Sequence, residues 1–242
     1  MTAIAPQAAD GRVSVGHDAR DVATTVLVGA AAGALAGLVA GGVAARIVML
    51  ALRALSDPIV IGATSDDGFE IGRFTVGGSF QLAGGMAAAG AANGILYVVL
   101  RGSIPARARA PLWSLFAAFV GGSQFLHAEG VDFTLLDPLW FAVLSFVVLP
   151  GLAALVVVLL AERWLADDGS RPSLAVLAIT AVTGTVALVL GAVATAAVLG
   201  ARRLGLARRL AVVGRLVVPA ALVIGTVAGA WVTIDEASQI LG

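Results

Sequence analysis

Six stretches of this sequence carry no charged residue and consist mainly of apolar side chains. A helix needs about 20 such residues to cross the roughly 30 Å hydrocarbon core of a membrane. Only helices and closed barrels cross it, because lipid offers no partner for backbone polar groups. Barrel strands would alternate over about ten residues, whereas these runs are continuous. We therefore expect an all-α polytopic transmembrane helix bundle with about six membrane helices, at residues 22–45, 80–100, 112–126, 139–161, 174–201 and 216–234.

The composition agrees with a lipid environment. Hydrophobic residues make up 60% of the 242-residue chain, and charged residues make up 12%, against about 25% in soluble domains. The formal net charge is zero, so no basic surface predicts a nucleic-acid partner. The absence of cysteine excludes disulfides, thiolate metal sites and cysteine nucleophiles. We expect residues 1–20 to form a disordered polar tail, and residues 21–242 a single transmembrane domain whose main partner is the bilayer.

One segment between the first two apolar runs is charged and rich in turn-forming residues. Residues 58–78 read PIVIGATSDDGFEIGRFTVGG, with β-branched and aromatic residues on both sides of an Asp-Gly pair. This pattern predicts a hairpin, because glycine adopts φ > 0 at little steric cost. Hydrocarbon does not tolerate the unpaired edge groups of a hairpin. We therefore expect a short extramembrane β-hairpin between helices 1 and 2.

The arginines predict an orientation, because short cytoplasmic loops are enriched in basic residues. The loop 101–111 has three arginines and no acid, which places it inside and the hairpin outside. Six crossings then place the arginine-rich segment 201–209 outside, and the arginines divide evenly between the two sides. If the short run 112–126 instead re-enters by turning at residues 121–124, segment 201–209 lies inside. Both topologies remain open from the sequence.

Glycines recur at intervals of four residues in three of the apolar runs. Glycine in a helix costs about 1 kcal/mol relative to alanine, so a ridge of glycines suggests a use. Small residues at this spacing let helix backbones approach closely in lipid. The ridges predict packing within the chain, a homo-oligomer seam or a pore lining. The residues are Gly29, Gly33, Gly37, Gly41, Gly90, Gly94, Gly225 and Gly229.

The remaining polar residues give no catalytic motif. The sequence has no HExxH, GxSxG or phosphate-binding loop, so we expect no enzyme, catalytic residue, metal site or cofactor. The amides Asn93, Gln81 and Gln124 predict hydrogen bonds between helices. The acids of the two predicted outer segments predict either solvated loops or a weak outer cation mouth. These acids are Asp57, Asp66, Asp67, Glu70, Glu129, Asp132 and Asp137, and His127 beside them matches no metal-binding spacing.

Several segments resemble uncharacterised multi-pass integral membrane proteins of high-GC actinobacteria. The resemblance covers roughly residues 40–165 and rests on ARIVMLALRAL, TSDDGFEIGRFTVGG, VDFTLLDPLWFAV and LAERW. It implies a bacterial cytoplasmic membrane and carries no assigned activity or site residue. We expect a non-enzymatic membrane scaffold, assembly or regulatory component. Its partner is either a second copy of the chain, in a homo-oligomer, or another membrane protein. The alternative is a small channel or transporter with an acidic outer mouth.

Overall fold

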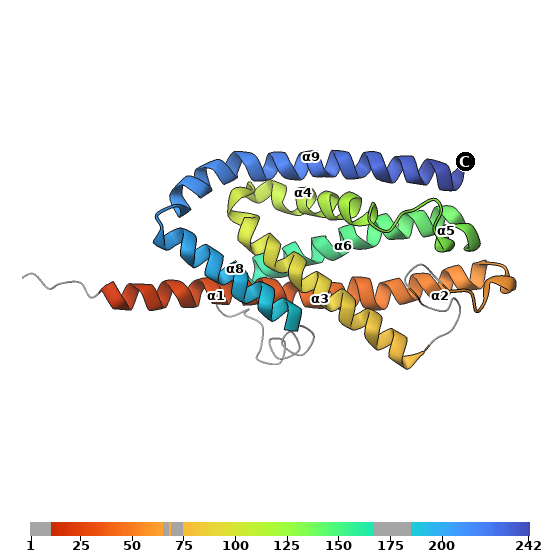
Figure 1. The fold of residues 1–242 in the computed structure, drawn as a ribbon, viewed down its shortest axis with the longest axis horizontal. Coiled ribbons are helices and arrows are strands. Elements are labelled where there is room, and N and C mark those ends of the chain that lie inside the picture. The colour runs from red at the N-terminus through yellow and green to blue at the C-terminus, as the bar shows by residue number, and fades with distance from the viewer. Residues whose placement is uncertain (1–10, 65–67, 69–74, 167–184) are drawn as a thin grey trace, which may run out of the picture.

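The structure, a computed structural model, describes residues 11–64, 68, 75–166 and 185–242. These residues form helices and no β-strand (Figure 1). The elements in chain order are α1 (Gly11–Ala36), the π-helix η1 (Gly37–Ala44), α2 (Ala45–Leu55), the 3-10 turn η2 (Pro58–Val60), α3 (Val76–Leu100), the 3-10 turns η3 (Arg101–Ser103) and η4 (Ala106–Ala108), α4 (Arg109–Phe116), the π-helix η5 (Ala117–Gly121), α5 (Val131–Leu135), α6 (Leu139–Ala166), α8 (Thr185–Arg203) and α9 (Ala207–Leu241).

The prediction of six crossing helices is not supported. In the described part of the chain, four helices are long and apolar enough to cross a membrane: Arg20–Leu55, Val76–Ser103, Leu139–Ala166 and Val212–Leu241. The predicted third helix is divided between the short α4 and η5. The predicted fifth helix overlaps α8, whose apolar part is only Gly191–Ala201, and residues 167–184 lie outside the described residues.

The first helix is longer than its apolar run at both ends. Residues 11–20, expected to belong to a disordered tail, form the first turns of α1; residues 1–10 lie outside the described residues. Beyond the run, η1 continues into α2 with helical backbone angles at Ala44 and Ala45. Charged residues at the ends of a membrane helix are tolerated because long side chains can reach the interface. The length of the uncharged run, residues 22–45, therefore underestimates the length of the helix.

The segment from Arg109 to Leu126 runs antiparallel to α6. Arg109 pairs with Glu162 near the C-terminal end of α6, and Leu126 shares a core cluster with Ala142 near its N-terminal end. Helix between those two α6 residues rises about 30 Å, at 1.5 Å per residue. The short segment covers this length because η5 and an irregular stretch extend α4. The chain therefore does not turn back at residues 121–124, as a re-entrant segment would.

The bundle has two chemically different ends. At the first, which we call the arginine end, α3 and α6 end while α4 and α9 begin. There the backbone of Gly214 in α9 lies against the side chain of Ser103 in η3. The arginine end lies at the left of Figure 1, where α8 also ends. Segments 101–109 and 201–209 therefore lie at the same end, whereas six crossings would separate them.

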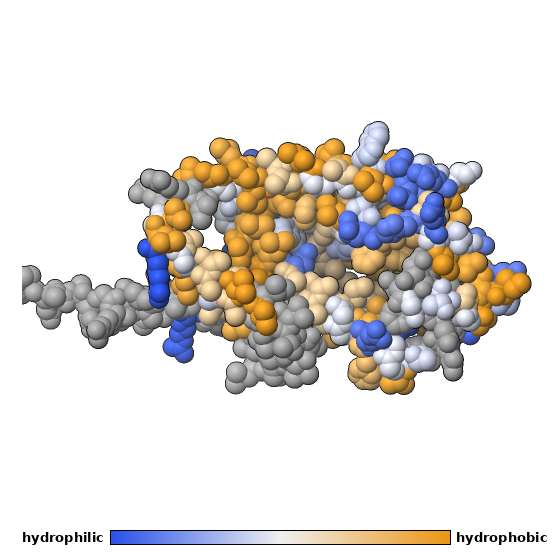
Figure 2. Space-filling view, in the orientation of Figure 1, coloured by the Kyte–Doolittle hydropathy of each residue, from blue (hydrophilic) through white to orange (hydrophobic). Residues whose placement is uncertain are grey.

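At the second end, which we call the acidic end, α2 and α9 end and α6 begins. The backbone N–H of Asp137 donates to Ser56 Oγ over 2.7 Å. The backbone N–H of Ala128 donates to Glu236 Oε2, also over 2.7 Å. These two bonds tie the loop between η5 and α6 to α2 and α9. In Figure 2, hydrophilic residues gather toward this end, while apolar residues cover most of α9 between the ends.

The predicted β-hairpin is not supported either. Its first flank, expected to be extended, is the 3-10 turn η2, because the Asp57 side chain accepts a hydrogen bond from Ile59 N over 2.9 Å. Thr75, expected in the second flank, instead caps α3 by accepting from Gly78 N over 3.1 Å. Gly68 has the positive φ, 78°, that the turn pattern predicts. Residues 65–67 and 69–74 lie outside the described residues.

Helices α1 and α3 cross in backbone contact through facing glycines. A Cβ added to Gly29 would lie 2.6 Å from the carbonyl oxygen of Gly94. Added Cβ atoms on Gly33 and Gly90 would each collide with the other glycine's carbonyl oxygen. Gly37 has the same relation to the backbone of Met86, one turn farther along α3. The four-residue spacing on both helices therefore brings the two backbones together at each turn.

We expect Gly90→Ala to destabilise the protein and Gly84→Ala to leave it unchanged or slightly more stable. Both positions lie in α3, where alanine has the better helix propensity by about 1 kcal/mol. A methyl group at position 90 meets the α1 backbone, whereas nothing lies within 4 Å of one at position 84. Thermal unfolding in detergent measures the difference. Equal midpoints for the two variants would show that α1 and α3 do not touch in this way.

Candidate functional site

A cavity between the helices lies at mid-height of the bundle. It has a volume of about 390 Å³, within the range of small-molecule pockets. One wall comes from η1, α2 and residues 82–93 of α3, and the other from the end of α4, η5, the residues after it and α6. Figure 2 shows this face hollowed where α3 diverges from α4. The lining residues include Gly37, Met49, Ala89, Asn93, Gln124, Ser145 and Ala153.

Two tryptophans of α6 indicate how deep in a membrane the cavity would lie. Trp140 and Trp164 are separated by roughly 36 Å of helix, close to the hydrocarbon thickness of a bilayer plus its interfaces. Tryptophan is enriched at such interfaces, and Trp140 is 58% exposed. The α6 residues lining the cavity run from Ser145 to Val157, midway between the two tryptophans. In a membrane, the cavity lies at the depth of the acyl chains.

Both π-helical segments border this cavity. Gly37 and Gly41 come from η1, and Val120 and Gly121 come from η5. π-Helical turns are rare and occur frequently at functional sites. Pro150 in α6 also lines the cavity and cannot donate a backbone hydrogen bond. The lining elements η1, η5 and α6 thus all depart from regular α-helical hydrogen bonding at the same depth, which favours a functional role for the cavity.

The polar side chains of the cavity lie toward its two ends. Asn93, on the arginine side, accepts a hydrogen bond from Trp113 Nε1 over 3.0 Å through its Oδ1. On the acidic side, Ser145 Oγ donates to the carbonyl of Phe141 over 2.7 Å. Within the described chain, neither the NH2 group of Asn93 nor the side chain of Gln124 has a hydrogen-bond partner. The cavity therefore offers amide donors at both ends of an apolar channel.

A charged cluster closes the arginine end above this cavity. Glu162 of α6 accepts from Tyr97 Oη over 2.6 Å and from Arg101 Nε over 3.0 Å. Arg109 Nη1 donates to the other carboxylate oxygen, Oε2, over 2.9 Å. One carboxylate thus ties α3, η3 and α4 to α6. A partly buried charge is stabilised only when paired and hydrogen-bonded, and Glu162 has three such partners.

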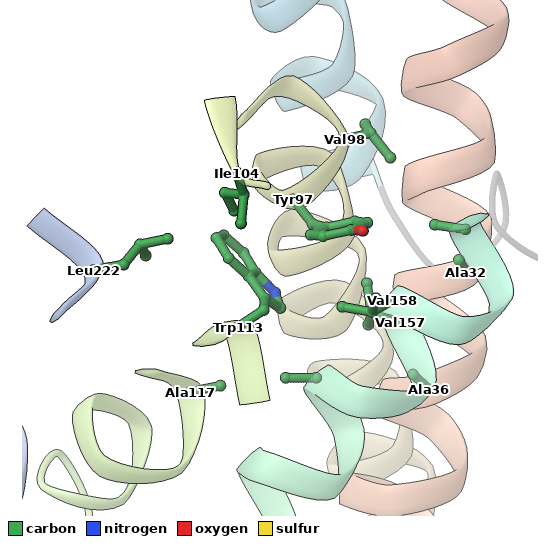
Figure 3. Packing of buried hydrophobic residues seen from close by; sticks show 12 residues of the cluster. Ala32, Ala36, Tyr97, Val98, Ile104, Trp113, Ala117, Val157, Val158 and Leu222 are labelled. Atoms are coloured by element: carbon green, nitrogen blue, oxygen red, sulfur yellow. The ribbon is translucent and has the colours of Figure 1, made fainter. Parts of the chain in front are cut away.

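An aromatic core fills the space beside that cluster (Figure 3). Tyr97 and Trp113 have no exposed surface, and their ring centroids lie 5.5 Å apart. Figure 3 shows Trp113 between Ile104 and the valines of α6, with Leu222 of α9 on the far side. Polar atoms of both aromatic rings are hydrogen-bonded, as buried tyrosine and tryptophan require. Packed side chains therefore occupy the arginine end between α3, α4, α6 and α9.

The structure distributes the remaining candidate residues over several places. Gly225 of α9 lies against the Phe116 ring, and Gly229 against the backbone of Phe119, so this ridge meets α4 and η5 of the same chain. Gly41 lies against the Met86 side chain. The glycine ridges are thus occupied by helices of their own chain.

Four of the acidic candidates lie at the acidic end of the described chain: Asp57 before η2, and Glu129, Asp132 and Asp137 between η5 and α6. Glu129 and Asp137 are exposed at the acidic end, and Asp132 lies in α5 beside them in the chain. No group of three or more His, Asp or Glu side chains in the described part of the chain could hold a metal ion. Asp66, Asp67 and Glu70 lie outside the described residues. Gln81 lies exposed near the start of α3.

Comparisons with protein-family models, curated proteins and solved structures give no match to this chain. The site therefore has to be interpreted from its own chemistry. Sequence reasoning missed Glu162, Tyr97 and Trp113 as one cluster. The available signal was the position of Glu162 directly after an apolar run, facing a loop that carries arginines and no acid. An acid in that place is a natural partner for them.

We expect Glu162→Gln to lower the unfolding free energy by about 1–2 kcal/mol. The glutamine keeps the shape but leaves two arginines without a charged partner, and the effect is limited because the Glu162 side chain is 31% exposed. Glu129→Gln is the control, because Glu129 is exposed at the other end. Thermal unfolding in detergent compares the two variants. A shift no larger than that of the control would contradict a structural role for this cluster.

Proposed function

We propose that this chain is a non-enzymatic component of a bacterial cytoplasmic membrane, which scaffolds or regulates other membrane molecules. The observation that carries the proposal is the closed arginine end. Tyr97 and Trp113 are fully buried there, and the charge of Glu162 is neutralised by Arg101 and Arg109. A transporter needs an aqueous path to its central site from both sides in turn. An end closed by an aromatic core and paired charges supports a protein that binds rather than one that conducts.

The distribution of arginines supports an orientation with the arginine end in the cytoplasm. Basic residues near the ends of membrane helices set orientation, with the excess on the cytoplasmic side. The described helices and turns at the arginine end carry Arg12, Arg20, Arg101, Arg107, Arg109, Arg163, Arg202, Arg203, Arg208, Arg209 and Arg215, whereas α2 carries Arg46 and Arg53. The even division that six crossings imply does not arise when both arginine-rich segments share one end.

Transport remains the second candidate because a cavity with two amides lies at mid-membrane. Central sites of transporters lie at this depth, often beside interrupted helices. The acids at the proposed outer end would attract cations over a short range, since charges are screened within about 8 Å at physiological salt. The two candidates differ in whether the arginine end can open.

Single cysteines test the proposed orientation, because the chain has none of its own. Gly102 and Leu204 are exposed positions at the arginine end, and Thr134 is an exposed position at the acidic end. In intact cells, we expect an impermeant thiol reagent to label Thr134→Cys and to leave Gly102→Cys and Leu204→Cys unlabelled until the membrane is permeabilised. Labelling of Leu204→Cys together with Thr134→Cys would support six crossings instead.

Flux measurements in proteoliposomes test the choice between binding and transport. We expect sodium and potassium flux through the wild-type protein to equal that of protein-free vesicles, because the arginine end is packed. A channel-forming peptide added to the same vesicles serves as the positive control. A protein-dependent flux that falls when Glu129 and Asp137 are both changed to their amides would make the transporter the better proposal.

A further inference from the structure

We propose that the mid-membrane cavity holds one acyl chain of a bilayer lipid that enters from the leaflet at the acidic end. The inference relies on the membrane placement proposed above and names a ligand for the cavity. Its first support is depth: the cavity lies between the levels of Trp140 and Trp164, where the surrounding solvent is hydrocarbon. The molecules that reach an opening at that depth are lipids or other lipophilic compounds.

The length of the cavity matches an extended chain. Its walls run from Gly37 to Met49 on η1 and α2, and from Ser145 to Val157 on α6. Each wall corresponds to roughly 18 Å along the bundle. An elongated apolar space of this length suits an extended hydrocarbon chain.

The lining chemistry fits hydrocarbon over most of this length. Small residues such as Gly37, Ala89 and Ala153 leave the space, and the long side chain of Met49 adapts to an irregular occupant. Water is a poor occupant, because an ordered water needs two to four polar partners. Phe125, which is 41% exposed, lies at the rim near the acidic end. The cavity is therefore open on the side from which a lipid of that leaflet would enter.

Gln124 provides a polar contact at the depth of a lipid ester. Gly122 lies against Phe146 and Val147 of the antiparallel α6, so Gln124 lies near the level of Ser145. That level is only about 8 Å along α6 from the interfacial Trp140. The Gln124 amide, which has no partner among the described residues, donates to the ester carbonyl, and the chain extends from there toward Asn93.

Photo-crosslinking tests the proposal. The full-length protein is reconstituted with a phosphatidylglycerol carrying a diazirine in the middle of one acyl chain, irradiated, digested and analysed by mass spectrometry. We expect crosslinks concentrated on the cavity-lining segments of η5 and α6. Ala153→Phe fills the cavity and should reduce these crosslinks at least fivefold. Leu152→Phe, whose parent side chain is 48% exposed on the outer face of α6, is the matched control and should keep them.

Uniform labelling of the outer faces, or equal cavity labelling in both phenylalanine variants, would overturn the proposal. If Ala153→Phe fails to fold, as judged by sizing in detergent, Gln124→Leu replaces it. The wild type should then bind an ester-linked phospholipid more tightly than its ether-linked analogue by about tenfold in native mass spectrometry, and Gln124→Leu should remove that preference. No ester preference in the wild type would overturn the proposed contact. Crosslinking and lipid preference depend on neither the orientation of the protein nor ion flux. A negative result here would therefore overturn the lipid site without contradicting the proposed function.

Discussion

The backbone contact between α1 and α3 determines how the rest of the bundle can assemble. Glycines on both helices bring carbonyl oxygens of one against the Cα atoms of the other at three successive turns. Apolar side chains cannot drive association in lipid, because the surrounding acyl chains are equally apolar. Close backbone packing can, since it adds many van der Waals contacts. Because the four-residue spacing drifts around a 3.6-residue helix, the pair crosses rather than running parallel.

That crossing, together with the Glu162 cluster, explains the mid-membrane cavity. At the arginine end, α3 is joined to α4 and α6 through the carboxylate of Glu162. Toward the acidic end, α3 follows α1 and diverges from α4 (Figure 1). The small residues and π-helical turns on the walls do not fill the resulting wedge. One end of the bundle is thus closed by polar and aromatic contacts, while its middle stays open to an apolar ligand.

Sequence reasoning succeeded where one physical constraint acts alone. The requirement for internal backbone hydrogen bonds in lipid makes long uncharged runs helical, and four such helices are present. It failed where constraints compete. Asp57 and Thr75 bond their own local backbone and start helical turns, which outweighs the strand tendency of the β-branched residues around them. The short third run, residues 112–126, was ambiguous because the length of an apolar run predicts a crossing only when the run forms one regular helix. Here the run is divided between α4, η5 and an irregular stretch.

By itself, the sequence determined the membrane-helix class, the glycine spacing and the arginine-rich segments, because each follows from local composition and periodicity. Only the tertiary structure decided that segments 101–109 and 201–209 share one end, that Glu162 joins three helical segments, and that Asn93 and Gln124 mark the ends of one cavity. These features depend on which helices lie side by side. Residues more than 50 positions apart, such as Arg109 and Glu162, leave no periodic signal in a single chain that would reveal their contact.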